Sequence, residues 1–219
     1  MYRRLLYNIP VLLMSLLLLA ACNGCSDSKK KEQKAEESPI NPMVQELDET
    51  PDNAVLVTLD RYDADSMYVT LVKKHVKTSY AYGEAMANGS FHGTMKKGNN
   101  YSVLATKRGR NVKIAVNTTE LKGRWIYDEA QHRGIDFNEG GGMSSINSQD
   151  ICFREWKLLN GKMYIYYVDM QQLASDRHQY LVEEANITAL DENELIIQFR
   201  GDRLWCKRPS KQPLRFTGH

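Results

Sequence analysis

The feature that most constrains the fold is a series of short alternating segments, joined by tight turns, in the second half of the chain. The expected strands are Gly123–Glu129, Gln131–Asn138, Met143–Ile146, Cys152–Leu159, Lys162–Met170, Arg177–Ala189, Glu194–Arg200 and Arg203–Arg208. Asn160-Gly161 is the strongest hairpin signal among their turns. Eight sequential strands at this spacing leave no room for the helices that parallel strands need. The pattern therefore predicts an up-and-down antiparallel barrel, of a size that closes around a packed core or one small ligand.

A smaller β module is expected before it, over residues 53–118, with the barrel over residues 119–210. The segments that alternate in hydropathy are Ala54–Arg61, Ser66–Lys73, Val76–Tyr82, Ser90–Met95, Tyr101–Lys107 and Asn111–Asn117. Glu84–Asn88 reads as one helical turn. The predicted fold class is all-β, and the first module is a small antiparallel barrel or sandwich, with an OB-like barrel as one candidate.

The first 21 residues have the pattern of an export signal. Arg3 and Arg4 precede an uncharged stretch, and Val11–Ala21 suits the apolar region of a signal peptide. A permanent membrane-spanning helix needs about 20 apolar residues, and Asn8 and Pro10 interrupt the stretch. We therefore expect a cleaved signal peptide over residues 1–21.

The end of this stretch, Leu19-Ala20-Ala21-Cys22, resembles the lipobox of bacterial lipoproteins. The resemblance implies that Cys22 becomes the lipidated amino terminus and that the protein's partner is a membrane. Two or more acyl chains hold a protein firmly to a bilayer. Cys25 fits less well, because Cys22 occupies its −3 position. The alternative is an ordinary signal peptide followed by an accidental cysteine.

Residues 22–52 are expected to form a flexible tether. The segment is rich in Lys, Glu, Ser and Pro and nearly free of aromatic and β-branched residues, so it has little apolar surface to bury. Surface lipoproteins of the Bacteroidetes often carry an acidic run after the lipidated cysteine. Here only Asp27 comes before Lys29-Lys30-Lys31, which favours an outer-membrane anchor facing the periplasm.

The barrel segments also carry a resemblance. Gly123-x-Trp125 is like the Gly-x-Trp signature of lipocalins, and three further segments follow it in the order seen in the lipocalin-like domain of Bacteroidetes lipoproteins. Those segments are Met143-Ser144-Ser145-Ile146-Asn147, Glu155-Trp156-Lys157-Leu158 and Asn160-Gly161-Lys162. The resemblance implies that Trp125 closes the barrel floor beneath a cation, for which the candidates are Arg203, Lys207 and Arg208. The chain is shorter than a full lipocalin, which argues against a deep calyx.

Aromatic residues gather in this second module, notably Trp156, Tyr164 and Tyr166. These three could line a pocket for a small apolar ligand. The alternative is that such side chains fill the barrel core and form cross-strand pairs on its surface.

Composition and motif searches give little support to other chemistry. The chain has 29 Lys and Arg against 27 Asp and Glu, and Arg3 and Arg4 leave with the signal peptide, so the mature chain is formally neutral. A basic part of the first module around Tyr101 could bind single-stranded nucleic acid. Export of the protein across the membrane argues against that partner, and an anionic glycan or lipid head group is the more accessible alternative. The five histidines lie far apart, the glycine-rich turn before Met143 lacks the features of a phosphate loop, and no nucleophile motif occurs. We expect no cofactor, no metal and no enzymatic activity.

Two smaller expectations concern thiols and modification. Cys152 and Cys206 lie in predicted strands of one barrel, so a disulfide between them and a pair of free thiols both stay open. Asp65-Ser66-Met67 resembles the O-glycosylation site of the Bacteroidetes, with Ser66 as the acceptor.

These observations together predict a membrane-anchored, non-enzymatic lipoprotein of the cell envelope. Its lipocalin-like domain would bind a small apolar ligand. The alternative is an envelope scaffold or inhibitor that binds another protein or a glycan with a filled barrel.

Overall fold

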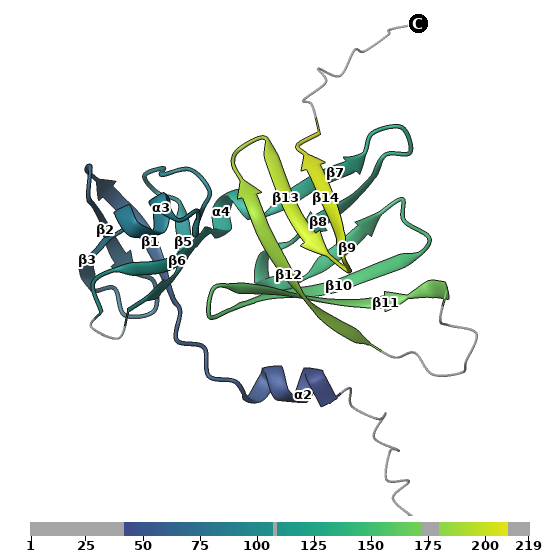
Figure 1. Cartoon of the computed structure of the whole chain (residues 1–219), viewed down its shortest axis with the longest axis horizontal. Coiled ribbons are helices and arrows are strands. Elements are labelled where there is room, and N and C mark those ends of the chain that lie inside the picture. Colours follow the sequence, from purple (N-terminus) through teal and green to yellow (C-terminus); the bar gives the residue numbers. More distant parts are fainter. Residues whose placement is uncertain (1–41, 107–108, 172–179, 210–219) are drawn as a thin grey trace, which may run out of the picture. The chain divides into compact units, whose positions relative to one another are not determined.

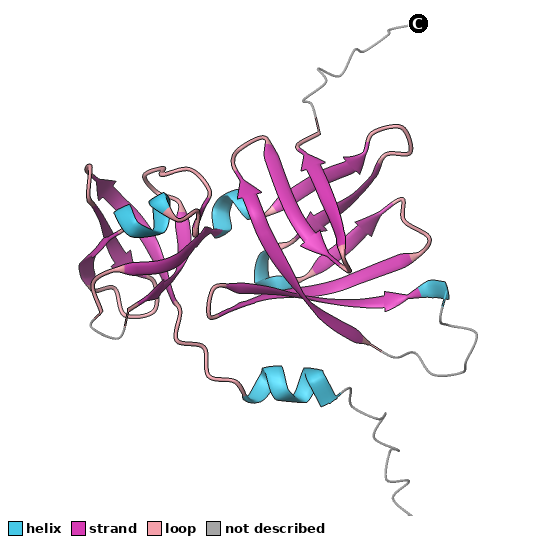
Figure 2. Cartoon of the chain, in the orientation of Figure 1, coloured by secondary structure: helices cyan, strands magenta, loops and turns pink. Residues whose placement is uncertain are grey.

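The computed structural model describes residues 42–106, 109–171 and 180–209, and these form a mostly β structure with two sheets (Figures 1 and 2). The predicted signal peptide and Cys22 lie outside the described residues. The predicted all-β fold class is confirmed.

The first sheet has the strand order β3-β2-β1-β5-β6-β4. Its strands are β1 (Val55–Tyr62), β2 (Ser66–Leu71), β3 (Lys77–Ala81), β4 (Phe91–His92), β5 (Asn100–Ala105) and β6 (Val112–Asn117). The helix α3 (Gly83–Ala87) follows β3, where one helical turn was expected. A parallel bridge from Ala81 to Asn111 joins the two flanks of the sheet. The bridge brings the end of β3 next to the start of β6, so the sheet curls toward a closed shape. A partly open barrel is also the form of the OB-like fold considered above.

The strand expected over Ser90–Met95 is much shorter in the structure, where β4 covers only Phe91 and His92. The chain leaves the sheet at Gly93, whose φ of +103° lies in the left-handed region that favours glycine. A Cβ atom at Gly93 would lie 2.3 Å from the Cβ atom of Asn117. This close approach ends the strand and turns the chain away.

The second sheet has eight strands in the order β10-β11-β12-β13-β14-β7-β8-β9. Their bounds are β7 (Gly123–Asp128), β8 (Arg133–Phe137), β9 (Met143–Ile146), β10 (Ile151–Leu159), β11 (Lys162–Asp169), β12 (Leu181–Leu190), β13 (Glu194–Phe199) and β14 (Asp202–Lys207). The short helix α4 (Thr118–Leu121) precedes β7, and the 3-10 turn η2 (Glu139–Gly141) joins β8 to β9. Each neighbouring pair is antiparallel, as the predicted meander requires.

The barrel is nearly closed, with a seam between β9 and β10. Gly142 forms an isolated antiparallel bridge with Glu155. Ser145 adds to the seam with its hydroxyl, which donates to the carbonyl of Ile151 (2.7 Å) and accepts from the amide of Phe153 (2.9 Å). These bonds satisfy edge groups that an open sheet would leave unpaired.

One continuous core fills the barrel, because every second side chain of each strand points inward. Its members come from all eight strands, and the inner residues of β11 show the alternation clearly as Met163, Ile165 and Tyr167. Val116 of β6 and Leu121 of α4 belong to the same core. The first sheet has a separate core, which includes Val57, Val69 and Tyr101.

The expectation of an unfolded tether up to residue 52 needs correction, because Pro42–Glu49 forms the helix α2. Proline is favoured at the first position of a helix. Asp48 near the end of the helix forms an ion pair with Lys157 of the barrel, at 2.6 Å. The residues after the helix are held by Asn160: its amide donates to Asp52 and its side chain bonds Pro51 and Asn53. Contacts with the barrel therefore order a segment whose composition alone would not fold.

Candidate functional site

The end of the barrel that holds the start of β7 is closed by a tryptophan beneath an arginine. Trp125 is fully buried, and its indole N–H donates to the carbonyl oxygen of Leu121 at 2.8 Å. The guanidinium carbon of Arg208 lies 3.7 Å from the centroid of the Trp125 ring. The same guanidinium donates to the backbone carbonyls of Glu120 and Arg124. Burial lowers the pKa of Arg208 from its ordinary value, and the nearby Glu120 carboxylate opposes that shift.

This geometry explains why a glycine stands two residues before the tryptophan. Gly123 has a φ of +97°, and a Cβ atom there would lie 2.8 Å from Nη1 of Arg208. Glycine therefore leaves the space through which the arginine reaches the ring.

Arg203, one of the residues expected above Trp125, lies elsewhere. On β14 the inward positions are those of Leu204 and Cys206, so Arg203 and Lys207 point outward and are exposed. Arg203 pairs in register with Gln198 of β13. Strand alternation thus removes Arg203 from the site, and the prediction for that residue is wrong.

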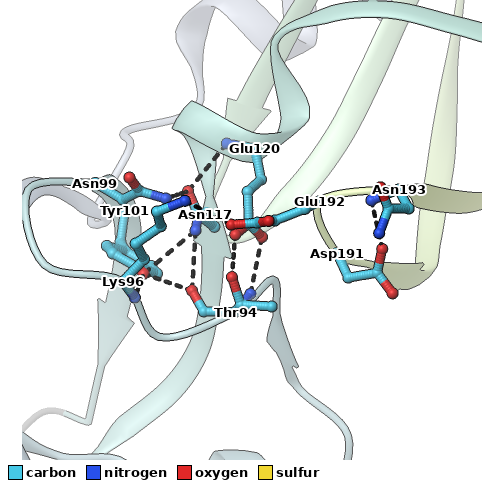
Figure 3. Close-up of polar contacts among 9 residues, drawn as sticks. All are labelled: Thr94, Lys96, Asn99, Tyr101, Asn117, Glu120, Asp191, Glu192 and Asn193. Atoms are coloured by element: carbon cyan, nitrogen blue, oxygen red, sulfur yellow. Dashed lines mark hydrogen bonds and ion pairs between the residues drawn. The ribbon is translucent and has the colours of Figure 1, made fainter. Parts of the chain in front are cut away.

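A buried polar cluster lies beside this closed end (Figure 3). Asn117 is fully buried; its side-chain oxygen accepts from the amide of Glu120, and its NH₂ group donates to the Thr94 carbonyl at 3.0 Å and to the Tyr101 hydroxyl at 3.2 Å. The Glu120 carboxylate accepts from both the amide and the hydroxyl of Thr94. Lys96 extends the cluster to the turn between β12 and β13, where it pairs with Glu192 at 2.6 Å.

The hydrogen bonds of this cluster give it a structural role. Both oxygens of the Glu120 carboxylate are occupied by donors from Thr94. A general acid or base must be free to exchange a proton with a substrate, and a carboxylate held on both oxygens is poorly placed to do so. Burial raises the pKa of Tyr101 to about 12, so its hydroxyl stays protonated and keeps donating to the Thr94 carbonyl.

The barrel interior contains the first of the three aromatic residues proposed to line a pocket. Trp156 is buried in the core, 5.7 Å from Phe137 between ring centroids, and its indole N–H donates to the carbonyl of Asn138. Farther along the barrel the Phe199 ring meets Phe153 at 5.8 Å and Tyr167 at 5.3 Å. These rings occupy the interior with the chain's own side chains.

Tyr164 and Tyr166 lie on the outer face of the barrel, so the prediction that they line an interior pocket is wrong. Ile165 between them points inward, and adjacent residues of a strand face opposite sides. The Tyr164 hydroxyl lies 3.4 Å from the Glu184 carboxylate, and the Nζ atom of Lys157 lies 5.1 Å from the centroid of the Tyr166 ring. A strand packed on both faces gives no alternating pattern from which the inward residues can be told.

The opposite end of the barrel carries polar groups that the sequence did not single out. The Tyr167 hydroxyl donates to the Glu183 carboxylate at 2.5 Å, and burial, together with this bond, raises the pKa of Tyr167. Arg200 pairs with the buried Asp169 at 3.0 Å and lies 5.5 Å from the Tyr167 ring centroid. Glu183 and Glu184 face opposite sides of β12, because Glu184 bonds Lys162 outside while Glu183 bonds the core residue Tyr167.

The two barrel cysteines are free thiols. Cys206 is fully buried in the core, whereas Cys152 is half-buried and precedes the inward-pointing Phe153. The two thiols therefore belong to opposite faces of the barrel wall, which a disulfide cannot bridge. Burial raises the pKa of the Cys206 thiol to about 12.

Two residues of the first module complete the comparison with the sequence. Ser66 is half-buried at the start of β2, where its amide donates to the Asp63 carboxylate at 2.9 Å; its glycosylation stays a prediction. Tyr101 is fully buried, so its ring offers no surface on which a base could stack.

Within the described part of the chain, no group of three or more His, Cys, Asp or Glu side chains could hold a metal ion. No helix in the same ranges is long and apolar enough to cross a membrane.

Comparison with known proteins agrees with this geometry for the second module. Residues 117–206 match a family model described as lipocalin-like. A solved structure, that of a lipocalin-like protein from Bacteroides thetaiotaomicron, is 23% identical, with a TM-score of 0.34, over 40% of this chain and 95% of that chain. A search of curated proteins found no match. The second module is therefore similar to a lipocalin-like domain over residues 117–206.

Proposed function

We propose that this protein is a lipid-anchored, non-enzymatic lipoprotein of the cell envelope that acts by binding, and that it binds with its surfaces rather than with a deep interior pocket. Its anchor would be Cys22, in the Leu19-Ala20-Ala21-Cys22 motif. The side of the membrane that it faces would be the periplasm, on the strength of the lysines that follow the cysteine.

The observation that carries the surface-binding proposal is the continuous core of the barrel. Side chains from all eight strands meet in it, and Trp125, Phe137 and Tyr167 are each at most 1% exposed. Protein interiors pack about as densely as organic crystals. A barrel filled this way keeps its rigidity and offers its outer face and loops to a partner.

A second candidate is the binding of a small apolar ligand inside the barrel, which the lipocalin-like match favours. Such a ligand would have to displace the rings of Phe153, Trp156 or Phe199. Extraction of protein purified from native membranes, followed by mass spectrometry, tests this candidate. A stoichiometric apolar molecule would support interior binding, and its absence would support the filled barrel.

The anchor is tested by metabolic labelling of the intact protein with palmitate. We expect label on the wild-type chain and on Cys25→Ser, and none on Cys22→Ser, because only Cys22 has the required residues before it. Label that persists on Cys22→Ser, or that disappears only with Cys25→Ser, would contradict the proposed anchor.

A further inference from the structure

The first module has an open depression of about 490 Å³ on its β2–β3 side, lined by Tyr68, Lys77, Thr78, Ser79, Gly109 and Arg110. Its volume lies in the range of about 300–1,000 Å³ that is usual for small-molecule sites. Lys77, Thr78 and Ser79 come from β3, and Tyr68 is paired with Ser79 from the neighbouring strand. The lining is mostly polar, which disfavours an apolar ligand.

The backbone fixes the two sides of this depression relative to each other. The amide of Ala81, at the end of β3, donates to the carbonyl oxygen of Arg110 at 2.7 Å, next to the bridge between Ala81 and Asn111. Arg110 therefore stays beside the strand that carries Lys77 instead of moving with a free loop. Such fixed placement lowers the entropy that a ligand must remove on binding.

The charge of the depression is positive. Lys77 and Arg110 are both exposed, and neither has an ion-pair partner in residues 42–106, 109–171 and 180–209. Asp63, whose carboxylate contacts the lining residue Tyr68, is already engaged: it accepts from the Tyr68 hydroxyl at 3.1 Å and from the amides of Asp65 and Ser66. These hydrogen bonds lower the pKa of Asp63 and tie its charge to the turn. Two cations therefore remain for an anionic ligand.

Tyr68 distinguishes between the anionic ligands that could bind. It is the one aromatic ring among these lining residues, and the Arg61 guanidinium carbon already lies over it, 3.6 Å from its centroid. Single-stranded nucleic acids bind largely by stacking their bases on open aromatic faces. A saccharide instead needs hydroxyl and amide groups to pair with its own hydroxyls, and the Ser79 hydroxyl and the backbone at Thr78 and Gly109 line the depression.

We propose that this depression binds a saccharide that carries a carboxylate or sulfate group. Lys77 and Arg110 would pair with the anionic group, and the Ser79 hydroxyl and the backbone groups at Thr78 and Gly109 would pair with the sugar hydroxyls. The inference rests on the proposed binding function and names a ligand class for one of the surfaces that function requires.

The test is calorimetric titration of the intact protein with an oligogalacturonate of four sugars, with cellotetraose as the uncharged probe. We expect the oligogalacturonate to bind at least tenfold more tightly than cellotetraose, with an affinity that falls as salt rises. Lys77→Gln and Arg110→Gln should each weaken binding about fivefold to tenfold, since each removes one of two cations. Lys113→Gln is the matched control, because Lys113 is an exposed cation of the same module outside the depression. It should leave the affinity within twofold.

Three outcomes would overturn the proposal: equal affinity for the charged and uncharged probes, binding that survives the double substitution of Lys77 and Arg110, or tighter binding of a thymidine oligonucleotide than of the oligogalacturonate. The last would assign the surface to nucleic acid. Inorganic phosphate as a third probe shows whether the anion alone suffices, in which case the saccharide part of the proposal is wrong. None of these results bears on the filled barrel or on Cys22, which the extraction and labelling experiments test separately.

Discussion

At the residue scale, Arg208 stabilises the closed end of the barrel. It covers Trp125 and bonds two backbone carbonyls that would otherwise lack this donor. A cation–π contact contributes about 0.5–2 kcal/mol, and a hydrogen bond from a charged group about 1.5–3 kcal/mol. Gly123, Trp125 and Arg208 therefore form one structural unit, which gives the Gly-x-Trp signature its physical meaning.

Replacing Arg208 should destabilise the protein much more than replacing its exposed neighbour. We expect Arg208→Ala to lower the free energy of unfolding by about 2–4 kcal/mol, from the lost stacking and hydrogen bonds. Arg203→Ala should change it by no more than about 0.5 kcal/mol, as is usual for exposed positions. Urea denaturation measures both values, and equal losses would contradict the placement of the two arginines.

The two barrel thiols should differ strongly in reactivity. Because the pKa of Cys206 is raised to about 12, less than about one molecule in a thousand carries the thiolate at pH 8. Alkylation of the native protein followed by peptide mapping should modify Cys152 and spare Cys206, and both should react in denaturant. Equal modification in the native protein, or a peptide that links the two cysteines, would contradict the structure.

His92 should make the stability depend on pH. Burial lowers its pKa below the ordinary value of 6.5, so the folded protein binds this proton less readily than the unfolded chain does. The contribution of the neutral imidazole is therefore complete above pH 6.5 and is lost as the pH falls from there through the lowered pKa.

The replacement His92→Gln should accordingly reduce the loss of stability between pH 7 and pH 5, whereas His132→Gln, at an exposed turn residue, should not. Thermal unfolding across this range measures the difference. Parallel pH profiles for the wild type and His92→Gln would show that burial does not affect this histidine.

At the element scale, the strands of the barrel were largely predictable, and the reasons are local. Met143–Ile146 matches its prediction, and Asn160-Gly161 forms the turn that its residues favour. The helix α2 and the shortness of β4 were not predictable, because both depend on contacts with distant residues: Lys157 and Asn160 for the helix, Asn117 for the strand. The sequence also did not show which residues of β11 point into the barrel, since residues on both faces of that strand are buried.

The hairpin between β10 and β11 gives a prediction for the contact between the two sheets. Gly161 has a φ of +80°, and a Cβ atom there would lie 2.8 Å from Ile114 of β6. Gly201 has nearly the same φ, +82°, but a Cβ atom there would meet open space. An alanine in the left-handed region costs about 1–2 kcal/mol at either position.

We therefore expect Gly161→Ala to lower the free energy of unfolding by about 1–3 kcal/mol more than Gly201→Ala does, through overpacking. Adding Ile114→Ala should remove most of this excess. Chemical denaturation of the wild type, Gly161→Ala, Ile114→Ala and the double variant forms the cycle that measures this coupling. Equal losses for the two glycine substitutions would show that Ile114 does not press on the hairpin.

At the scale of the whole molecule, the fold could be predicted further than the site. Turn residues and alternation indicate eight antiparallel strands, and the Gly-x-Trp segment resembles the lipocalin signature, which the match over residues 117–206 supports. The interior was open to two interpretations, because aromatic residues can either line or fill a barrel. The choice depends on which rings meet, such as Phe137 with Trp156 and Phe199 with Tyr167, and those contacts join residues far apart in the sequence.

The central claim is that the barrel is filled by its own side chains, and crystals of the protein under xenon pressure test it most directly. Xenon enters dry apolar cavities of roughly 150 Å³. The account predicts no ordered xenon inside the eight strands. A xenon atom enclosed by Trp156, Ile165 and Phe199 would contradict it and would favour a barrel that holds a small apolar ligand.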